Sequence, residues 1–136
     1  MDSWEIPEGA DEDRLIEDWI RFQYLHRDGK PIDAVIWAHA ALDDMCDSHP
    51  QACFEMIQKV LVKDSSEMIL SALAAGPLED LLSRHGPAII EEISSAATRE
   101  PHIRTMLTGV WKSTIDPTVW DRVQEIVARG GVNQQR

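Results

Sequence analysis

Apolar residues recur at intervals of three and four along most of the chain, which is the spacing of a helix with one buried face. In residues 11–27, Leu15, Trp19 and Phe22 follow this spacing. Acidic residues precede them, where they complement the positive end of a helix dipole. The pattern predicts a first helix that ends near residue 27, before a glycine.

Three further helices are predicted before residue 76. Pro31 fits the first position of the second helix, whose apolar stripe is Ile32, Val35, Ile36, Leu42 and Met45. Ser48 as N-cap and Pro50 at the start open the third helix, over residues 51–62. The segment from Asp64 to Glu67 has the spacing of a capping box before a fourth helix over residues 68–75.

Proline punctuates the rest of the chain. Each of four junctions is predicted to stop one helix and start the next, and these are Gly76-Pro77, Gly86-Pro87, Glu100-Pro101 and Asp116-Pro117. No segment shows sustained strand alternation. We therefore expect an all-α fold of about eight short helices, arranged as a compact bundle or as stacked helix pairs. The compact bundle is favoured because no repeat of about 30 to 45 residues is evident.

A length of 136 residues, 43% of them hydrophobic, suits one domain with one core. We expect this domain to span residues 11–130. Residues 1–10 contain too few apolar residues for an element, although Trp4 and Ile6 could dock, and they are predicted to form a flexible acidic arm. Residues 131–136 are predicted to form a flexible polar tail.

The formal charge is -11, and residues 1–68 hold 16 acidic against 6 basic residues. This potential repels phosphate backbones and anionic lipid, so nucleic acid and membranes are not expected partners, whereas a basic protein would be attracted. The alternative is that acidity only maintains solubility. Neither a signal peptide nor an apolar run of membrane-spanning length is evident, which predicts a cytoplasmic location.

Two groups of residues could carry chemistry. Cys46, His49 and Cys53 have the side chains of a zinc site in the spacing C-x2-H-x3-C, but buried free cysteines are the favoured interpretation. His39 and Asp43 lie four residues apart on one helix face, as a base and its orienting carboxylate would. No nucleophile accompanies them, so a half-buried, hydrogen-bonded histidine is favoured.

Paired carboxylates offer a third possibility. Glu91 and Glu92, with Glu79 and Asp80 one helix earlier, could act as acid and base or bind a hard cation. Such residues on short helices more often form a solvated face. We predict no catalytic residues, no metal and no cofactor.

Four short segments carry a family resemblance. They are Gly76-Pro77-Leu78-Glu79, His85-Gly86, Leu107-Thr108-Gly109-Val110-Trp111 and Val119-Trp120-Asp121-Arg122-Val123. They resemble a small bacterial helical family of uncharacterised function, over roughly residues 70–125 and more loosely around Trp19. The resemblance implies an all-helical fold and assigns no chemistry. Trp111 and Trp120 are interpreted first as core anchors and second as partner contacts.

These observations predict a non-catalytic binding protein, specifically an immunity-type inhibitor that neutralises a basic protein such as a bacterial toxin. A helical adaptor that uses its tryptophans and a small zinc enzyme are the alternatives, and a homodimer remains open. The predicted partner-binding residues are Asp11, Asp13, Glu17, Asp18, Asp43, Asp44, Asp47, Trp111 and Trp120. Whether the carboxylates form one continuous patch depends on how the first two helices pack.

Overall fold

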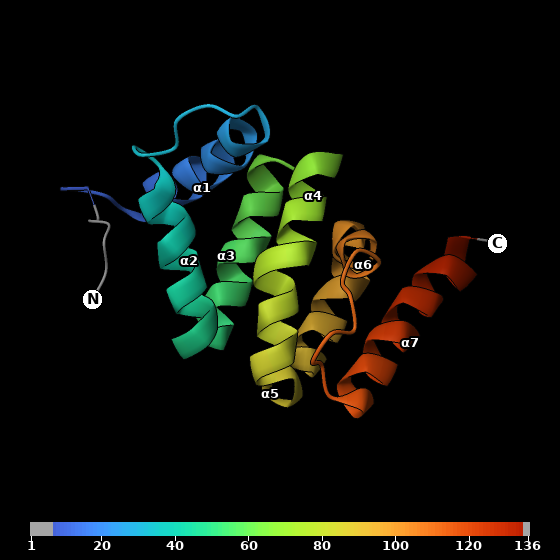
Figure 1. Cartoon of the computed structure of the whole chain (residues 1–136). Coiled ribbons are helices and arrows are strands. Elements are labelled where there is room, and N and C mark those ends of the chain that lie inside the picture. Colours follow the sequence, from blue (N-terminus) through green and yellow to red (C-terminus); the bar gives the residue numbers. More distant parts are fainter. Residues whose placement is uncertain (1–6, 135–136) are drawn as a thin grey trace.

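A computed structural model describes residues 7–134 of the chain, with side-chain burial for residues 7–129 (Figure 1). This part contains helices and no strands, which confirms the all-α prediction. The helices are α1 (Glu12–Arg27), α2 (Ile36–Ser48), α3 (Pro50–Lys63), α4 (Glu67–Leu73), the π-helical segment η1 (Ala74–Leu78), α5 (Glu79–Arg99), α6 (Pro101–Leu107) and α7 (Pro117–Gln134). None of the helices described is long and apolar enough to cross a bilayer.

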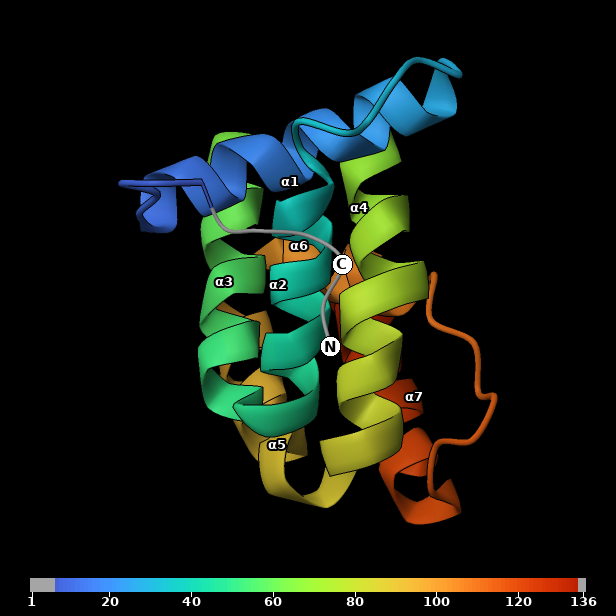
Figure 2. The same cartoon turned by 60° about the vertical axis from the view of Figure 1, so that its left-hand side comes forward.

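The helices pack in chain order. Each one contacts the next, and α5 also contacts α2, α3 and α7. α2 runs in the same direction as the continuous rod formed by α4, η1 and the part of α5 before His85. α3 lies beside them and runs in the opposite direction, while α1 crosses their upper end (Figure 2). One core runs through all of them, and its largest fully buried side chains include Trp19, Phe54 and Leu42. This arrangement confirms a bundle of short helices.

The first helix begins and ends as its sequence predicts. The Asp11 side chain accepts a hydrogen bond from the Arg14 backbone N–H at 3.0 Å and caps α1. Gly29, at a φ of 68°, provides the left-handed conformation that takes the chain out of the helix. The apolar face of α1 buries Ile16, Trp19 and Phe22.

Three predicted helix starts need correction. α2 begins at Ile36 rather than at Pro31, because residues 32–35 form a turn in which the Val35 N–H donates to the Ile32 carbonyl. His49, not Ser48, is the N-cap of α3. Ser66 caps α4, and Asp64 instead accepts from the Ser66 N–H, so the capping box does not form.

The proline junctions divide into two kinds. Pro101 and Pro117 begin α6 and α7 as predicted, with side-chain caps from Glu100 and Asp116. Pro77 does not end a helix. It lies inside η1, where wider π-helical turns accommodate a residue that lacks an N–H donor.

Gly86-Pro87 breaks α5 into a first arm before His85 and a second arm after it. His85 leaves the helical region, with φ -133° and ψ 21°, and the chain reverses direction there (Figure 2). Gly86 is buried against Val119 of α7.

The structure describes parts of the predicted arm and of the predicted tail. α7 continues through Gly130 and Gly131 to Gln134, four residues beyond the predicted end of the domain. In the predicted arm, residues 7–10 form a turn in which the Ala10 N–H donates to the Pro7 carbonyl. Trp4 and Ile6 lie outside the described residues.

Tyr24 fastens α1 to the turn between α3 and α4. Its hydroxyl donates to Asp64 Oδ2 at 2.7 Å and lies 3.0 Å from Ser66 Oγ. Burial opposes ionisation of Asp64, but the hydrogen bonds from Ser66 and Tyr24 outweigh it and lower the pKa of this carboxyl below 3.8. Ionised Asp64 therefore stabilises the fold above that pH.

We expect Tyr24→Phe to lower the free energy of unfolding by about 1 kcal/mol at pH 7, because one hydrogen bond to a carboxylate is lost. The lowered pKa means that the stabilisation by ionised Asp64 is present above pH 3.8 and is lost as the pH falls through its folded-state value. Urea unfolding at pH 7 and pH 3 measures both effects. An equal loss at the two pH values would contradict the role of the ionised carboxyl.

Candidate functional site

The predicted acidic residues of α1 lie opposite lysines of α3. Glu17 Oε2 is 4.0 Å from Lys63 Nζ, and the neighbouring Glu12 binds Lys59 at 2.6 Å. Asp11 is exposed but caps its own helix, and Asp13 is also exposed. Most of the acidic side chains of this helix are therefore either paired with a lysine or engaged in capping the helix.

Asp18 is not a surface residue, and its assignment as a partner contact is wrong. Only 5% of its surface is exposed. Its Oδ2 accepts hydrogen bonds from the Trp37 indole N–H at 2.8 Å and from Arg14 Nε at 2.9 Å. The carboxylate joins α1 to α2 inside the bundle, because a buried indole N–H needs an acceptor.

The other predicted carboxylates gather on a different surface. Asp43, Asp44 and Asp47 are exposed on the second half of α2, which runs beside the first arm of α5 (Figure 2). Asp47 binds Arg84 at 2.9 Å next to the reversal at His85, at the end of the bundle away from α1. The predicted residues thus form two separate groups rather than one patch.

Asp80 of α5 joins this second group, and we call Asp43, Asp44, Asp47 and Asp80 the acidic face. Burial raises the pKa of Asp43 above its ordinary value, and the carboxylates Asp80 and Asp44 raise it further, against His39 and Arg84. Like charges are therefore held close together here without full compensation. The sequence identifies Glu79 and Asp80 only as paired carboxylates, and the packing of α5 on α2 places Asp80 beside Asp43.

The two predicted tryptophans differ in environment. Trp120 is partly buried against the core, as expected for an anchor. Trp111 is 76% exposed and lies in the loop between α6 and α7, so the core interpretation is wrong for this residue. A residue in a loop belongs to no helical periodicity from which its exposure could be predicted.

Two of the segments that carry the family resemblance, at residues 76–79 and 107–111, lie against each other in the structure. The Trp111 backbone N–H donates to Glu79 Oε1 at 3.3 Å. Gly109 approaches the η1 segment so closely that a Cβ atom on it would lie 3.1 Å from the Cβ of Ala74. The loop that carries Trp111 is thereby held against the start of α5, next to the acidic face.

Cys46 and Cys53 are joined by a disulfide across the α2–α3 corner. Both residues are buried, whereas His49 between them is exposed. The pairing removes the thiolate ligands that the zinc hypothesis requires, and residues 7–134 hold no group of three potential metal ligands. Disulfides persist chiefly in oxidising compartments, so the cytoplasmic location stays a prediction.

The His39–Asp43 pair lacks the hydrogen bond of a base with an orienting carboxylate. Their nearest atoms, Nε2 and Oδ2, are 3.8 Å apart. The His39 ring instead stacks on Phe22, with ring centres 4.3 Å apart, and its Nδ1 is buried without a hydrogen-bond partner. The residue is half-buried as expected, but packing rather than hydrogen bonding holds it.

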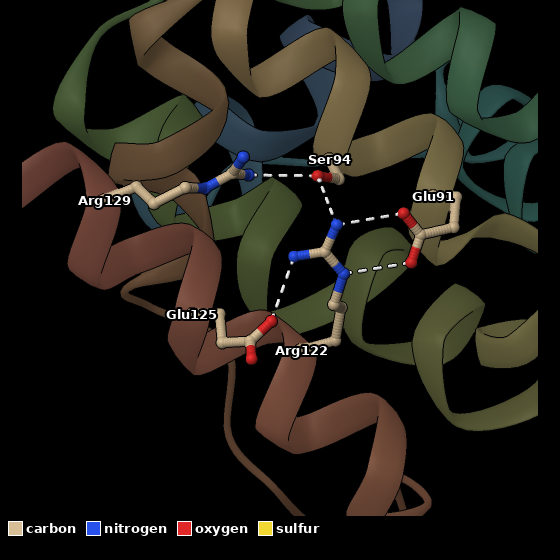
Figure 3. A network of polar contacts seen from close by, with 5 residues as sticks. All are labelled: Glu91, Ser94, Arg122, Glu125 and Arg129. Carbon is tan, nitrogen blue, oxygen red and sulfur yellow. Dashed lines mark hydrogen bonds and ion pairs between the residues drawn. The ribbon is translucent and has the colours of Figure 1, made fainter.

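Glu91 belongs to a polar clamp between α5 and α7 (Figure 3). Both of its oxygens accept from Arg122 at 3.0 Å, and Arg122 also binds Glu125. The hydroxyl of buried Ser94 accepts from Arg122 and from Arg129. The hydrogen bond to Arg122 lowers the pKa of Glu91, so this carboxyl serves as a structural ion-pair partner rather than as a general acid.

A pocket of about 330 Å³ lies where the α2–α3 corner meets the second arm of α5. It is lined by His49, Pro50, Gln51, Ala52 and Ala88. His49 is the sole ionisable residue in this lining, so the pocket does not assemble a base with a nucleophile.

Comparison with known proteins gives a family but no activity. No curated protein and no solved structure matches the chain. One family model matches residues 26–131, which is most of the chain and includes the acidic face and Trp111. The chain therefore belongs to DUF6869, a family of unknown function, as the resemblance implied.

Proposed function

We propose that this chain is a non-catalytic binding protein, an inhibitor that neutralises a basic protein partner such as a bacterial toxin in the cytoplasm. The supporting observation is the acidic face. Burial, and after it the nearby carboxylates Asp80 and Asp44, raise the pKa of Asp43 against His39 and Arg84, so the fold disfavours the ionised form of this exposed residue. Charged side chains that lower the stability of the folded state are typical of a surface used for binding.

The partner should be basic because its cations would relieve the repulsion among these carboxylates. Asp43, Asp44 and Asp47 are all exposed and therefore accessible to it. Complementary charge accelerates association and weakens with salt. Lys59 and Lys63 already face Glu12 and Glu17 on α1, and Arg84 likewise pairs with Asp47, so Asp43 and Asp44 are the carboxylates that the partner's cations suit best.

The test is affinity capture from the source organism at low salt, with elution by a salt gradient, followed by reconstitution with the purified partner. We expect the triple variant Asp43→Asn, Asp44→Asn, Asp47→Asn to bind about tenfold to a hundredfold more weakly. The double variant Glu12→Gln, Glu17→Gln is the matched control and should bind as the wild type does. Equal weakening in both, or binding that is insensitive to salt, would contradict the proposal.

Asp43→Asn alone should stabilise the fold while it weakens binding. The raised pKa means that ionised Asp43 destabilises the folded chain at pH 7, and that this penalty disappears as the pH falls below 3.8. We therefore expect a higher Tm at pH 7 and a difference that vanishes near pH 3. Thermal unfolding measures the Tm of Asp43→Asn and of the control variant Asp13→Asn at both pH values. A lower Tm of Asp43→Asn at pH 7 than of the wild type would show that ionised Asp43 supports the fold.

An adaptor that binds through tryptophan is the second candidate, favoured by the exposure of Trp111. In that case Trp111→Ala would abolish partner binding without unfolding the chain, and the triple aspartate variant would bind normally. The same reconstituted assay separates the two functions.

A further inference from the structure

The disulfide between Cys46 and Cys53 lies beneath an exposed corner of the fold. It joins the last turn of α2 to the first turn of α3, at the end of the bundle away from α1 (Figure 2). Both cysteines are buried. Residues 47–52, which lie between them, are all exposed or half-buried. Local opening of this segment therefore removes little apolar surface from the core, which makes it a motion of low free energy.

The pocket of about 330 Å³ borders this segment. Four of its lining residues, His49, Pro50, Gln51 and Ala52, lie between the two cysteines, and the fifth is Ala88 of α5. The space beside the segment gives a small thiol reagent room to approach. A disulfide that is buried under such a segment is attacked when the segment opens, because exchange requires access to a sulfur atom.

The core also suits the reduced chain. Cys46 Sγ lies 3.7 Å from the carbonyl oxygen of Pro77 in η1. In the disulfide this sulfur carries no proton, whereas the thiol of a reduced chain can donate to that oxygen. Cys53 becomes a small apolar side chain in the core, where free cysteines are most often found. Both redox states are therefore compatible with the same packing.

We propose that Cys46 and Cys53 form a redox switch, which fixes the corner between α2 and α3 when oxidised and releases it when reduced. In the reduction, two low-molecular-weight thiols give two electrons and two protons to the bond. The bond becomes two cysteine thiols, and the reagent thiols leave joined as a disulfide. Oxidation by a low-molecular-weight disulfide reverses this exchange. The proposal rests on the proposed function for its compartment, because cytoplasmic disulfides are usually transient and redox-sensing.

Asp47 connects the switch to the acidic face. It follows Cys46 directly, its side chain binds Arg84 at 2.9 Å, and its carbonyl oxygen lies 2.8 Å from Nε2 of His85. A disulfide limits the conformations of the chain that it closes. The oxidised corner therefore holds Asp47 against α5, whereas the reduced corner opens more often and loosens this edge of the acidic face.

The test is to equilibrate the whole chain in mixtures of reduced and oxidised glutathione, trap the free thiols by alkylation and count them by mass spectrometry. We expect complete reduction and complete oxidation at the two extremes, reached from either direction, with an unchanged far-UV circular dichroism spectrum. Amide hydrogen exchange in residues 47–53 should be about tenfold faster in the reduced chain, because the covalent constraint on this segment is lost. Exchange in α7 should not change.

The matched control is the double variant Cys46→Ser, Cys53→Ala, which cannot form the bond and should exchange as the reduced chain does in every buffer. Serine keeps a donor for the Pro77 carbonyl, and alanine stays apolar. Unfolding on reduction, a bond that stays intact in reduced glutathione, or equal exchange in the two forms would overturn the switch. These readouts involve no partner, so failure to capture a basic partner would contradict the proposed function alone.

Discussion

Asp18→Ala is expected to lower the free energy of unfolding by about 2 to 4 kcal/mol, the combined effect of a lost charged hydrogen bond and a buried donor without an acceptor. The donor is the indole N–H of Trp37, which is 5% exposed and now donates to Asp18 at 2.8 Å. The side chain of Arg14 would lose its partner as well, at smaller cost because it is half exposed. Urea unfolding at pH 7 measures the loss.

Asp13→Ala is the control for this experiment. Asp13 lies on the same helix but is exposed, so its removal should change stability by less than about 0.5 kcal/mol. Asp18→Asn should lie between the two, because an amide oxygen can still accept from the indole. If Asp18→Ala and Asp13→Ala unfold alike, the buried hydrogen bond contributes nothing to the stability of the fold.

Gly86→Ala is expected to destabilise the chain by about 1 to 3 kcal/mol, the usual cost of overpacking. A Cβ atom at this position would lie 2.9 Å from one methyl carbon of Val119 and 3.0 Å from the other. Val119 is buried and β-branched, so it cannot rotate away freely. The helix that follows the reversal at His85 would be pushed away from α7.

Two further variants test the contact itself. Val119→Ala opens the space that the new methyl group needs, so the double variant should be less destabilised than the sum of the single variants. Gly76→Ala should be neutral or slightly stabilising, because a Cβ atom there would meet nothing within 4 Å. Additive losses in the double variant would show that Gly86 and Val119 do not interact.

Helix positions follow from local signals where those signals act within one turn. The Asp11 cap, Pro101 and Pro117 each satisfy or remove donors at a helix start, so the sequence alone locates these ends. The prediction for Pro77 is wrong because the same residue can be absorbed by a π-helical turn when packing favours a continuous rod. Local chemistry cannot distinguish the two outcomes.

The candidate site is harder to predict because it depends on which helices meet. Asp13 and Asp18 lie in the same acidic stretch of the sequence, which does not distinguish them. Only the position of Trp37 on the next helix makes Asp18 a buried hydrogen-bond acceptor. Glu79 and Trp111 are 32 residues apart and carry no shared pattern, yet the fold brings them to one surface. Burial and long-range proximity are tertiary properties, and charge counts do not encode them.

The packing of each helix on its predecessor has a consequence for how the chain reaches this structure. Most contacts can form by closing short loops, and low sequence separation between contacting residues is the main determinant of rapid folding. We expect refolding in microseconds to milliseconds, at the fast end for a domain of this size. The corners between α2 and α3 and between α5 and α6 need the shortest closures, since one residue separates the helices at each, and we expect the folding nucleus to form at such a corner.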